Sequence, residues 1–455
     1  MSYFAQLPEL KKQFEDLAMK AVEIAKSKGA DEVRVRISGG KGLDVSSRHC
    51  EVENLEFNQM QGMSITVYKD KHCGHANTSD FSIASITDTA ESALNLCKYT
   101  SRDEFAGLCD ANELYQGDED LELLYELEED PDTLVKRAVD LDKLAVAMVD
   151  KNKDKGLKES DGASYSTMYS VRTLATSHGF CKSSVESEYS KYISLVGEQN
   201  GVMQRSGGSY IGINPALEWA DERVADEAVQ RTLGKLGASK VKTGKYNIIF
   251  SRGAASELML PFINAISGML IYQNSSFLKD SLNSQVFPEF LSVKEDPLIK
   301  GGIASALFDA EGVATRPLDV VSNGILKEFF IDTYSGRKLN MKCNGHNDPC
   351  YNIFFNPDDE HGGSLEDILK KAGSGIVVHQ LMGQGVNIVN GNYSRGVSGY
   401  YFENGERVHA VDEITVAGNL KEMYASIAMI GNDRDERRRI QTGSVWIPEL
   451  TVSGS

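Results

Sequence analysis

The order of periodicities in the first hundred residues constrains the fold most. Residues 9–28 repeat apolar side chains every three or four positions, as in an amphipathic helix, and Gly29 is a natural stop. Residues 31–38 then alternate apolar and polar side chains, which predicts a strand. Further strand-like runs follow at 43–47, 52–57 and 63–68. A second helical pattern covers 83–99, so we predict an α+β unit with helices on one sheet face.

A glycine run, Gly39-Gly40-Lys41-Gly42, separates the first two strand-like runs. Glycine-rich loops can cradle phosphate, but those loops lead from a strand into a helix. Because this run lies between two strand-like runs, we predict a hairpin turn.

The rest of the chain divides into two compositions. Residues 109–131 are dense in Asp and Glu and favour a solvated connecting loop, and Pro131 opens a helical pattern. A β-meander is predicted over 162–212 and a helix over 219–235. We therefore expect an N-terminal α/β-layered domain with an antiparallel sheet over 1–240, with the acidic linker at about 109–131.

The remaining residues, 241–455, predict a mostly β C-terminal domain of sandwich or barrel type. They contain many glycine-centred turns and strand-like runs, with fewer helical patterns. Asn404-Gly405 lies between strand-like segments and predicts a tight hairpin, because both turn positions favour positive φ.

Charge and cysteine usage limit the function classes. The 455 residues carry 48 Lys and Arg against 66 Asp and Glu, a formal charge of −18. Such a surface repels nucleic acid and anionic lipid but suits cationic peptides. The 7 cysteines are scattered and odd in number, so a disulfide framework is not expected. With no signal-peptide pattern and no long apolar run, we expect a cytoplasmic protein without direct nucleic-acid or membrane binding.

The familiar phosphate-loop, nucleophile-elbow and His-Glu-x-x-His signatures are missing. Two His/Cys clusters remain as alternatives. His72-Cys73-Gly74-His75 could hold zinc but lacks a nearby fourth ligand. Cys343, His346 and Cys350 are spaced in a loop as metal ligands often are, and a zinc site there would need a distant fourth ligand such as His361. The alternative is a functional or packing loop in which the cysteines are incidental.

A further cluster, Arg434, Arg437, Arg438 and Arg439, is predicted at the end of a helix that begins at Asn419. Cations are favourable near a helix C-terminus, which explains them structurally. Gripping a carboxylate of a partner or peptide is the functional alternative.

Four ordered motifs give the second half a family resemblance. They are the segments 308–316 (FDAEGVATR), 323–339, 385–396 and 417–433. Together they resemble the TldD/PmbA family, whose members are described as modulators of DNA gyrase.

The resemblance also separates two branches of that family. The TldD branch resembles metallopeptidases with a His-Glu-x-x-x-His helix and a further cysteine ligand near the C-terminus. Here the corresponding positions, Leu260–Ala265, read Leu-Pro-Phe-Ile-Asn-Ala, and the last cysteine is Cys350. This implies the PmbA (TldE) branch, without a metal, a cofactor or catalytic residues of its own.

For that branch the resemblance implies a heterodimer with a TldD-type metalloprotease subunit, in which unfolded or extended peptides are cut. A homodimer is the other expected assembly. Asn387, Arg395 and Asn419 lie in glycine-rich motif loops and offer donors to peptide carbonyls or a carboxylate. Alternatively, these residues set backbone turns, with Asn419 capping its helix.

Three functional hypotheses follow. The first is the PmbA/TldE-like subunit, inactive alone because His-Glu-x-x-x-His is absent. The second is a stand-alone peptidase that uses an unrecognised site such as the Cys343/His346/Cys350 loop. The third is a regulatory binding protein that acts on DNA gyrase without proteolysis.

Overall fold

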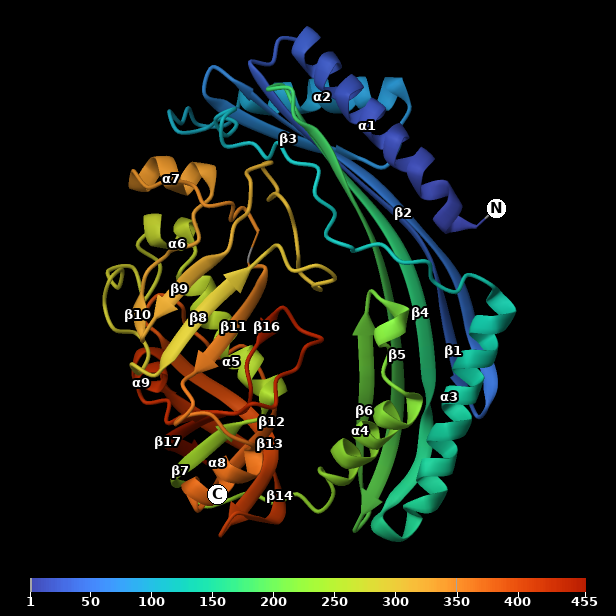
Figure 1. The fold of residues 1–455 in the computed structure, drawn as a ribbon, viewed down its shortest axis with the longest axis vertical. Coiled ribbons are helices and arrows are strands. Elements are labelled where there is room, and N and C mark those ends of the chain that lie inside the picture. Colours follow the sequence, from blue (N-terminus) through green and yellow to red (C-terminus); the bar gives the residue numbers. More distant parts are fainter. Residues whose placement is uncertain (1, 349) are drawn as a thin grey trace.

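A six-stranded antiparallel sheet forms one side of the molecule, and a β-rich body lies against it (Figure 1). The structure is a computed structural model that describes residues 2–348 and 350–455. The strand order is β3-β2-β1-β4-β5-β6. The strands are β1 (Glu32–Arg48), β2 (Glu51–Lys69), β3 (His72–Thr78), β4 (Leu157–Thr176), β5 (Cys181–Gln199) and β6 (Val202–Gly212).

The four short strands expected over 31–68 are two long ones, β1 and β2. The predicted hairpin at Gly39–Gly42 is wrong, because these glycines lie inside β1. A Cβ at Gly40 would lie 2.8 Å from the Tyr169 carbonyl oxygen, and one at Gly42 only 2.0 Å from that of Thr167. The glycines therefore permit β4 to approach closely, and the turn lies at His49-Cys50, where both φ angles are positive.

Helices cover one face of the sheet and complete the predicted α+β arrangement. They are α1 (Tyr3–Ser27), α2 (Ile83–Cys97), α3 (Pro131–Lys151) and α4 (Asp221–Leu233). α1 begins earlier than residue 9 because its first turn has partners distant in sequence. The Glu129 carboxylate accepts the N–H groups of Tyr3 and Phe4, at 2.6 and 2.7 Å.

The acidic segment is a connection without regular helix or strand, as predicted, but it is not fully solvated. Leu114, Leu121 and Leu127 are buried. The Leu127 N–H donates to the Tyr169 hydroxyl, and the Tyr115 N–H donates to the Gly312 carbonyl of the body. The segment thus contacts both the sheet and the body.

The body contains two sheets, ordered β10-β9-β8-β11-β16 and β14-β13-β12-β7-β17-β15. Because β14 also pairs with β17, five strands of the second sheet close into a barrel-like ring, in agreement with a mostly β second half. The strands of the body, from both sheets, are β7 (Gly244–Phe250), β8 (Leu291–Asp296), β9 (Leu318–Ser322), β10 (Ile325–Leu326), β11 (Asn352–Pro357), β12 (Ser374–Met382), β13 (Asn392–Glu403), β14 (Glu406–Asn419), β15 (Met429–Ile430), β16 (Ile440–Gln441) and β17 (Val445–Ser453). The predicted Asn404-Gly405 hairpin joins β13 to β14, with φ angles of 53° and 79°.

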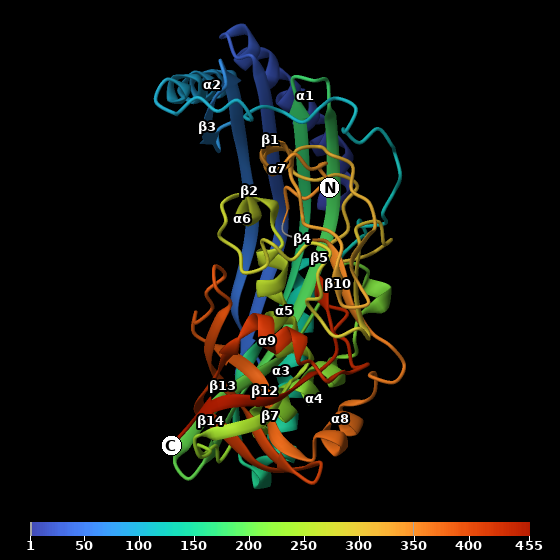
Figure 2. The same cartoon turned by 90° about the vertical axis from the view of Figure 1, so that its left-hand side faces the viewer.

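The body's helices are α5 (Arg252–Ala265), α6 (Gly268–Tyr272), α7 (Thr333–Leu339), α8 (Leu365–Ala372) and α9 (Leu420–Ala425). Figure 2 shows the long strands of the first sheet continuing past the body at the end where α2 lies. None of the described helices has the length and apolar composition needed to cross a bilayer.

Candidate functional site

α5 carries Leu260–Ala265, the positions at which the family resemblance places the metal motif. Most of the helix is buried in the core of the body. Glu257, Leu260 and Asn264 are only partly buried or exposed, and their spacing puts them on one accessible stripe. The stripe offers one carboxylate and neither an imidazole nor a thiolate.

Arg395, on β13, reaches this stripe. Its Nη1 lies 3.6 Å from Oε2 of Glu257. The Nε of Arg395 and the hydroxyl of Tyr393 are buried without a hydrogen-bond partner. Burial also raises the pKa of the Tyr393 hydroxyl, which keeps it a neutral donor. These two atoms are enclosed, but the Arg395 side chain as a whole is 16% exposed, so its guanidinium is the group that an acceptor from outside the chain can reach.

Asn387 lies on the turn that precedes β13, and Asn419, the last residue of β14, bonds to the same turn. The Asn387 carboxamide accepts the Val389 N–H at 2.9 Å. Asn419 accepts the Lys421 N–H at the start of α9, and its Nδ2 donates to the Asn390 carbonyl at 2.9 Å. Both side chains therefore hold backbone, while Arg395 lies farther along β13, opposite Val416.

Cys343, His346 and Cys350 are buried. Nε2 of His346 lies 2.6 Å from Glu295 Oε2, and its ring stacks on Phe330 at 4.0 Å between centroids. Burial raises the pKa of Cys343 and of Cys350 to about 12, which disfavours the thiolate that nucleophilic attack requires. This geometry does not support the loop as a peptidase site.

The first His/Cys cluster lies in β3. Nδ1 of His75 lies 3.2 Å from the Thr66 hydroxyl, and Nδ1 of His72 lies 2.7 Å from the Thr100 carbonyl. Among residues 2–348 and 350–455, no group of three or more His, Cys, Asp and Glu side chains could hold a metal ion.

The predicted placement of the arginine cluster at a helix end is wrong, because α9 stops at Ala425. Arg437 is instead held by the buried Asp435 and the partly buried Glu227. Its Nε lies 2.7 Å from Asp435 Oδ1, and its Nη1 lies 3.1 Å from Glu227 Oε2. Glu227 belongs to α4, so Arg437 joins the body to the layer of helices on the sheet.

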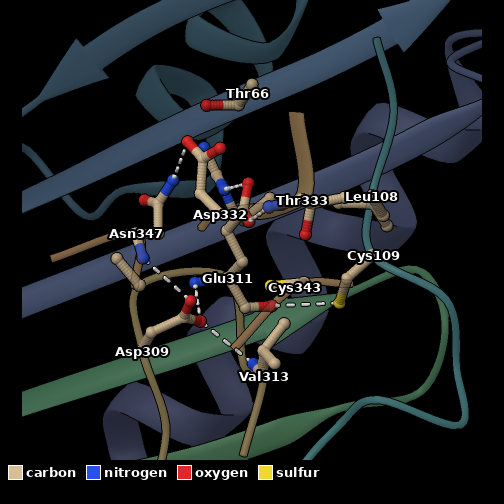
Figure 3. A network of polar contacts seen from close by, with 12 residues as sticks. Thr66, Leu108, Cys109, Asp309, Glu311, Val313, Asp332, Thr333, Cys343 and Asn347 are labelled. Carbon is tan, nitrogen blue, oxygen red and sulfur yellow. Dashed lines mark hydrogen bonds and ion pairs between the residues drawn. The ribbon is translucent and has the colours of Figure 1, made fainter. Parts of the chain in front are cut away.

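The motif 308–316 forms a second junction between the body and the sheet, and Figure 3 shows its contacts. The buried Asp309 carboxylate accepts the N–H groups of Glu311, Val313 and Asn347 at 2.8–3.0 Å. Glu311 accepts the Thr333 N–H at 3.0 Å, and its Oε1 lies 3.3 Å from Nη1 of Arg34 on β1.

These junction residues were missed in the sequence as members of a site. The available signals were an arginine on the alternating strand 31–38 and two carboxylates two residues apart in a glycine motif. Neither signal shows that the two segments meet.

Asp309 should make stability depend on pH. Burial and the negative charge of Glu311 raise the pKa of Asp309 to about 7. The pKa of an aspartate in the unfolded chain is about 3.9. Between that pH and about 7, the folded chain keeps Asp309 protonated while the unfolded chain does not, so the folded state loses stability as the pH rises through this range. We expect the free energy of unfolding of the wild type to fall relative to Asp309→Asn, by at most about 1.4 kcal/mol per pH unit. Urea unfolding of both proteins between about pH 5 and 8 measures this, and parallel profiles would contradict it.

Comparison with known proteins identifies the family. Residues 33–97, 124–236 and 243–454 match the models of PmbA/TldA metallopeptidase domain 1, central domain and C-terminal domain. Metalloprotease PmbA of Escherichia coli is 36% identical over 454 residues, covering 100% of this chain and 99% of that protein. The Haemophilus influenzae homolog of PmbA is 35% identical and covers 96% of this chain and 95% of that protein.

Solved structures share the fold. A Bacteroides thetaiotaomicron protein, named as a candidate modulator of DNA gyrase, superposes with a TM-score of 0.88 at 24% identity, over 97% of this chain and 98% of that one. TldE from Thermococcus kodakarensis gives 0.80 at 21% identity, over 96% and 100%. With its motifs, its three matched segments and full-length relatives above 30% identity, the chain belongs to the PmbA/TldD family.

Proposed function

We propose that this chain is the PmbA/TldE-type subunit of a cytoplasmic TldD/TldE-type metalloprotease complex that processes or degrades unfolded peptides. The observation that carries the proposal is α5, whose Leu260–Ala265 positions hold neither metal-binding histidine. A catalytic zinc takes three protein ligands, and no group of His, Cys, Asp and Glu side chains in the described part of the chain fits one. The metal chemistry therefore belongs to a TldD-type partner.

The role left to this chain is to hold the substrate. The partly exposed guanidinium of Arg395 suits a peptide carbonyl or a terminal carboxylate, and Glu257 suits a basic side chain. Asn387 and Asn419 hold the loop before β13 in place, so we assign them a supporting role in substrate binding.

The experiment compares the chain alone, a TldD-type subunit from the same organism alone, and the two mixed. The substrate is an unfolded, fluorescently labelled protein. We expect efficient cleavage only in the mixture, with loss of cleavage on treatment with a metal chelator. Cleavage by this chain alone would overturn the proposal.

A variant in the mixture tests the substrate-binding role. Arg395→Met keeps the aliphatic stem and removes a charged donor, which is worth about 1.5–3 kcal/mol. We expect KM to rise at least about tenfold, with kcat less affected. Arg102→Met, at an exposed arginine that pairs with Glu104, is the matched control. An unchanged KM in Arg395→Met would remove Arg395 from the site.

A further inference from the structure

The two edge strands of the six-stranded sheet are treated differently. Along β6, charged side chains form hydrogen bonds with the outward-facing main-chain groups of alternate residues. Arg231 donates to the Gly207 carbonyl at 3.2 Å and Lys235 to the Arg205 carbonyl at 3.1 Å. At Ser209, Glu227 accepts the N–H and Arg437 donates to the carbonyl. These contacts block pairing with another strand.

β2, the strand exposed along part of the opposite edge, has no such cover over Glu51–Met60, which we call the β2 edge. β3 pairs with β2 only from Met63 onward. Within the described chain, neither a strand nor a side chain bonds the outer main-chain groups of the β2 edge. Ten residues at about 3.3 Å each make a template roughly 30 Å long.

Apolar side chains and negative charge accompany this open edge. Val52, Leu55, Phe57 and Met60 are exposed, Phe57 by 60%. Leu55 and Phe57 pair in register with Val45 and Leu43, so they continue the apolar face that the helices cover on β1. Glu51, Glu53 and Glu56 provide the charge, and no Lys or Arg lies between Arg48 and Lys69. Arg48 offsets part of it, with its Nη1 3.9 Å from Glu53 Oε1.

We propose that the β2 edge binds an extended, positively charged stretch of unfolded polypeptide as an additional strand. Main-chain hydrogen bonds do not depend on the side chains, so peptides of many sequences can form them. The exposed apolar residues and glutamates of the β2 edge favour apolar and basic side chains in the added strand. A second copy of this chain is disfavoured, because it would set its own three glutamates against those of the first. The choice of substrate rests on the proposed function, whereas the strand addition is a property of this chain alone.

The test uses the full chain without a partner subunit, so its failure leaves the cleavage experiment unaffected. The probe is an unstructured twelve-residue peptide in which lysine alternates with valine or threonine, and the control peptide has glutamate in place of lysine. We expect amide hydrogen exchange in the β2 edge to slow at least about tenfold at alternate residues on addition of the lysine peptide. The β6 edge should not change.

Variants separate charge from fold. Glu53→Lys with Glu56→Lys should weaken binding of the lysine peptide at least about tenfold. Asp359→Lys with Glu360→Lys, at two exposed residues of the body, makes the same change in net charge and should alter binding less than about twofold. Leu55→Ser with Phe57→Ser should weaken binding without changing its charge preference.

Three results would overturn the proposal. They are unchanged exchange in the β2 edge, equal binding of the glutamate peptide, and a dimer in solution whose β2 edge is already protected without peptide. The last result would assign the edge to a second copy of the chain.

Discussion

Replacing Glu311 with alanine should destabilise the chain by about 3–5 kcal/mol, the usual effect of breaking a buried ion pair. The Arg34 side chain is only 17% exposed and its Nε already lacks a partner. Without Glu311, its Nη1 loses its ion-pair partner and the Thr333 N–H loses its acceptor. Because Arg34 lies on β1 and Glu311 in the body, the loss falls on the junction between the two parts.

Urea unfolding of the wild type, Glu311→Ala and a control measures the effect. The control is Glu23→Ala, whose side chain is 65% exposed and pairs with Lys20 one helical turn away. Such a surface pair is worth about 0.5 kcal/mol or less. A loss in Glu311→Ala no larger than in the control would contradict the role of this pair.

The double variant Arg34→Met with Glu311→Leu removes both charges together. It should recover a large part of the lost stability, because apolar replacements of similar size leave no buried charge unpaired. This outcome would separate the cost of an unpaired charge from a loss of packing.

Local patterns predicted the elements whose stabilising contacts are near in sequence. The helices near 83–99 and after Pro131 carry their own caps and apolar stripes, and the structure has both. The glycine run in β1 was misread because local rules treat glycine as a turn former. Its actual constraint comes from β4, more than a hundred residues away.

The candidate site shows the same limit. Motif spacing singled out Arg395, but only the fold shows that its Nε and the Tyr393 hydroxyl are buried without partners. Asp309 was noticed as part of a motif, yet one of its three donors is the N–H of Asn347 in a different loop. Arg437 was assigned to a helix end because the length of α9 could not be read from periodicity. Side chains that join distant segments are set by tertiary packing, which a single sequence does not display.

Arg437→Met should cost about 1.5–3 kcal/mol, the usual worth of hydrogen bonds to charged groups. Asp435 and Glu227 would lose their shared partner and keep the more exposed Arg438 and Arg231. Asp435 is 3% exposed and Glu227 12% exposed at the side chain, and both bond to Arg437. Burial by itself would raise the pKa of Asp435, yet the hydrogen bond and charge of Arg437 hold it below its usual value. The stabilisation is therefore present at neutral pH and is lost as the pH falls below about 4.

The same substitution also removes a cap from the β6 edge, since Arg437 donates to the Ser209 carbonyl. Arg438→Met is the matched control: Arg438 bonds the same Asp435 at 3.3 Å but is 42% exposed, so its loss should cost less than about 1 kcal/mol. Chemical unfolding at neutral and acidic pH, with amide exchange at Gly207–Ser209, measures both consequences. Two results would show that Arg437 does not hold these carboxylates. One is an equal loss of unfolding free energy in the two variants, and the other is a difference between them that stays the same at acidic pH.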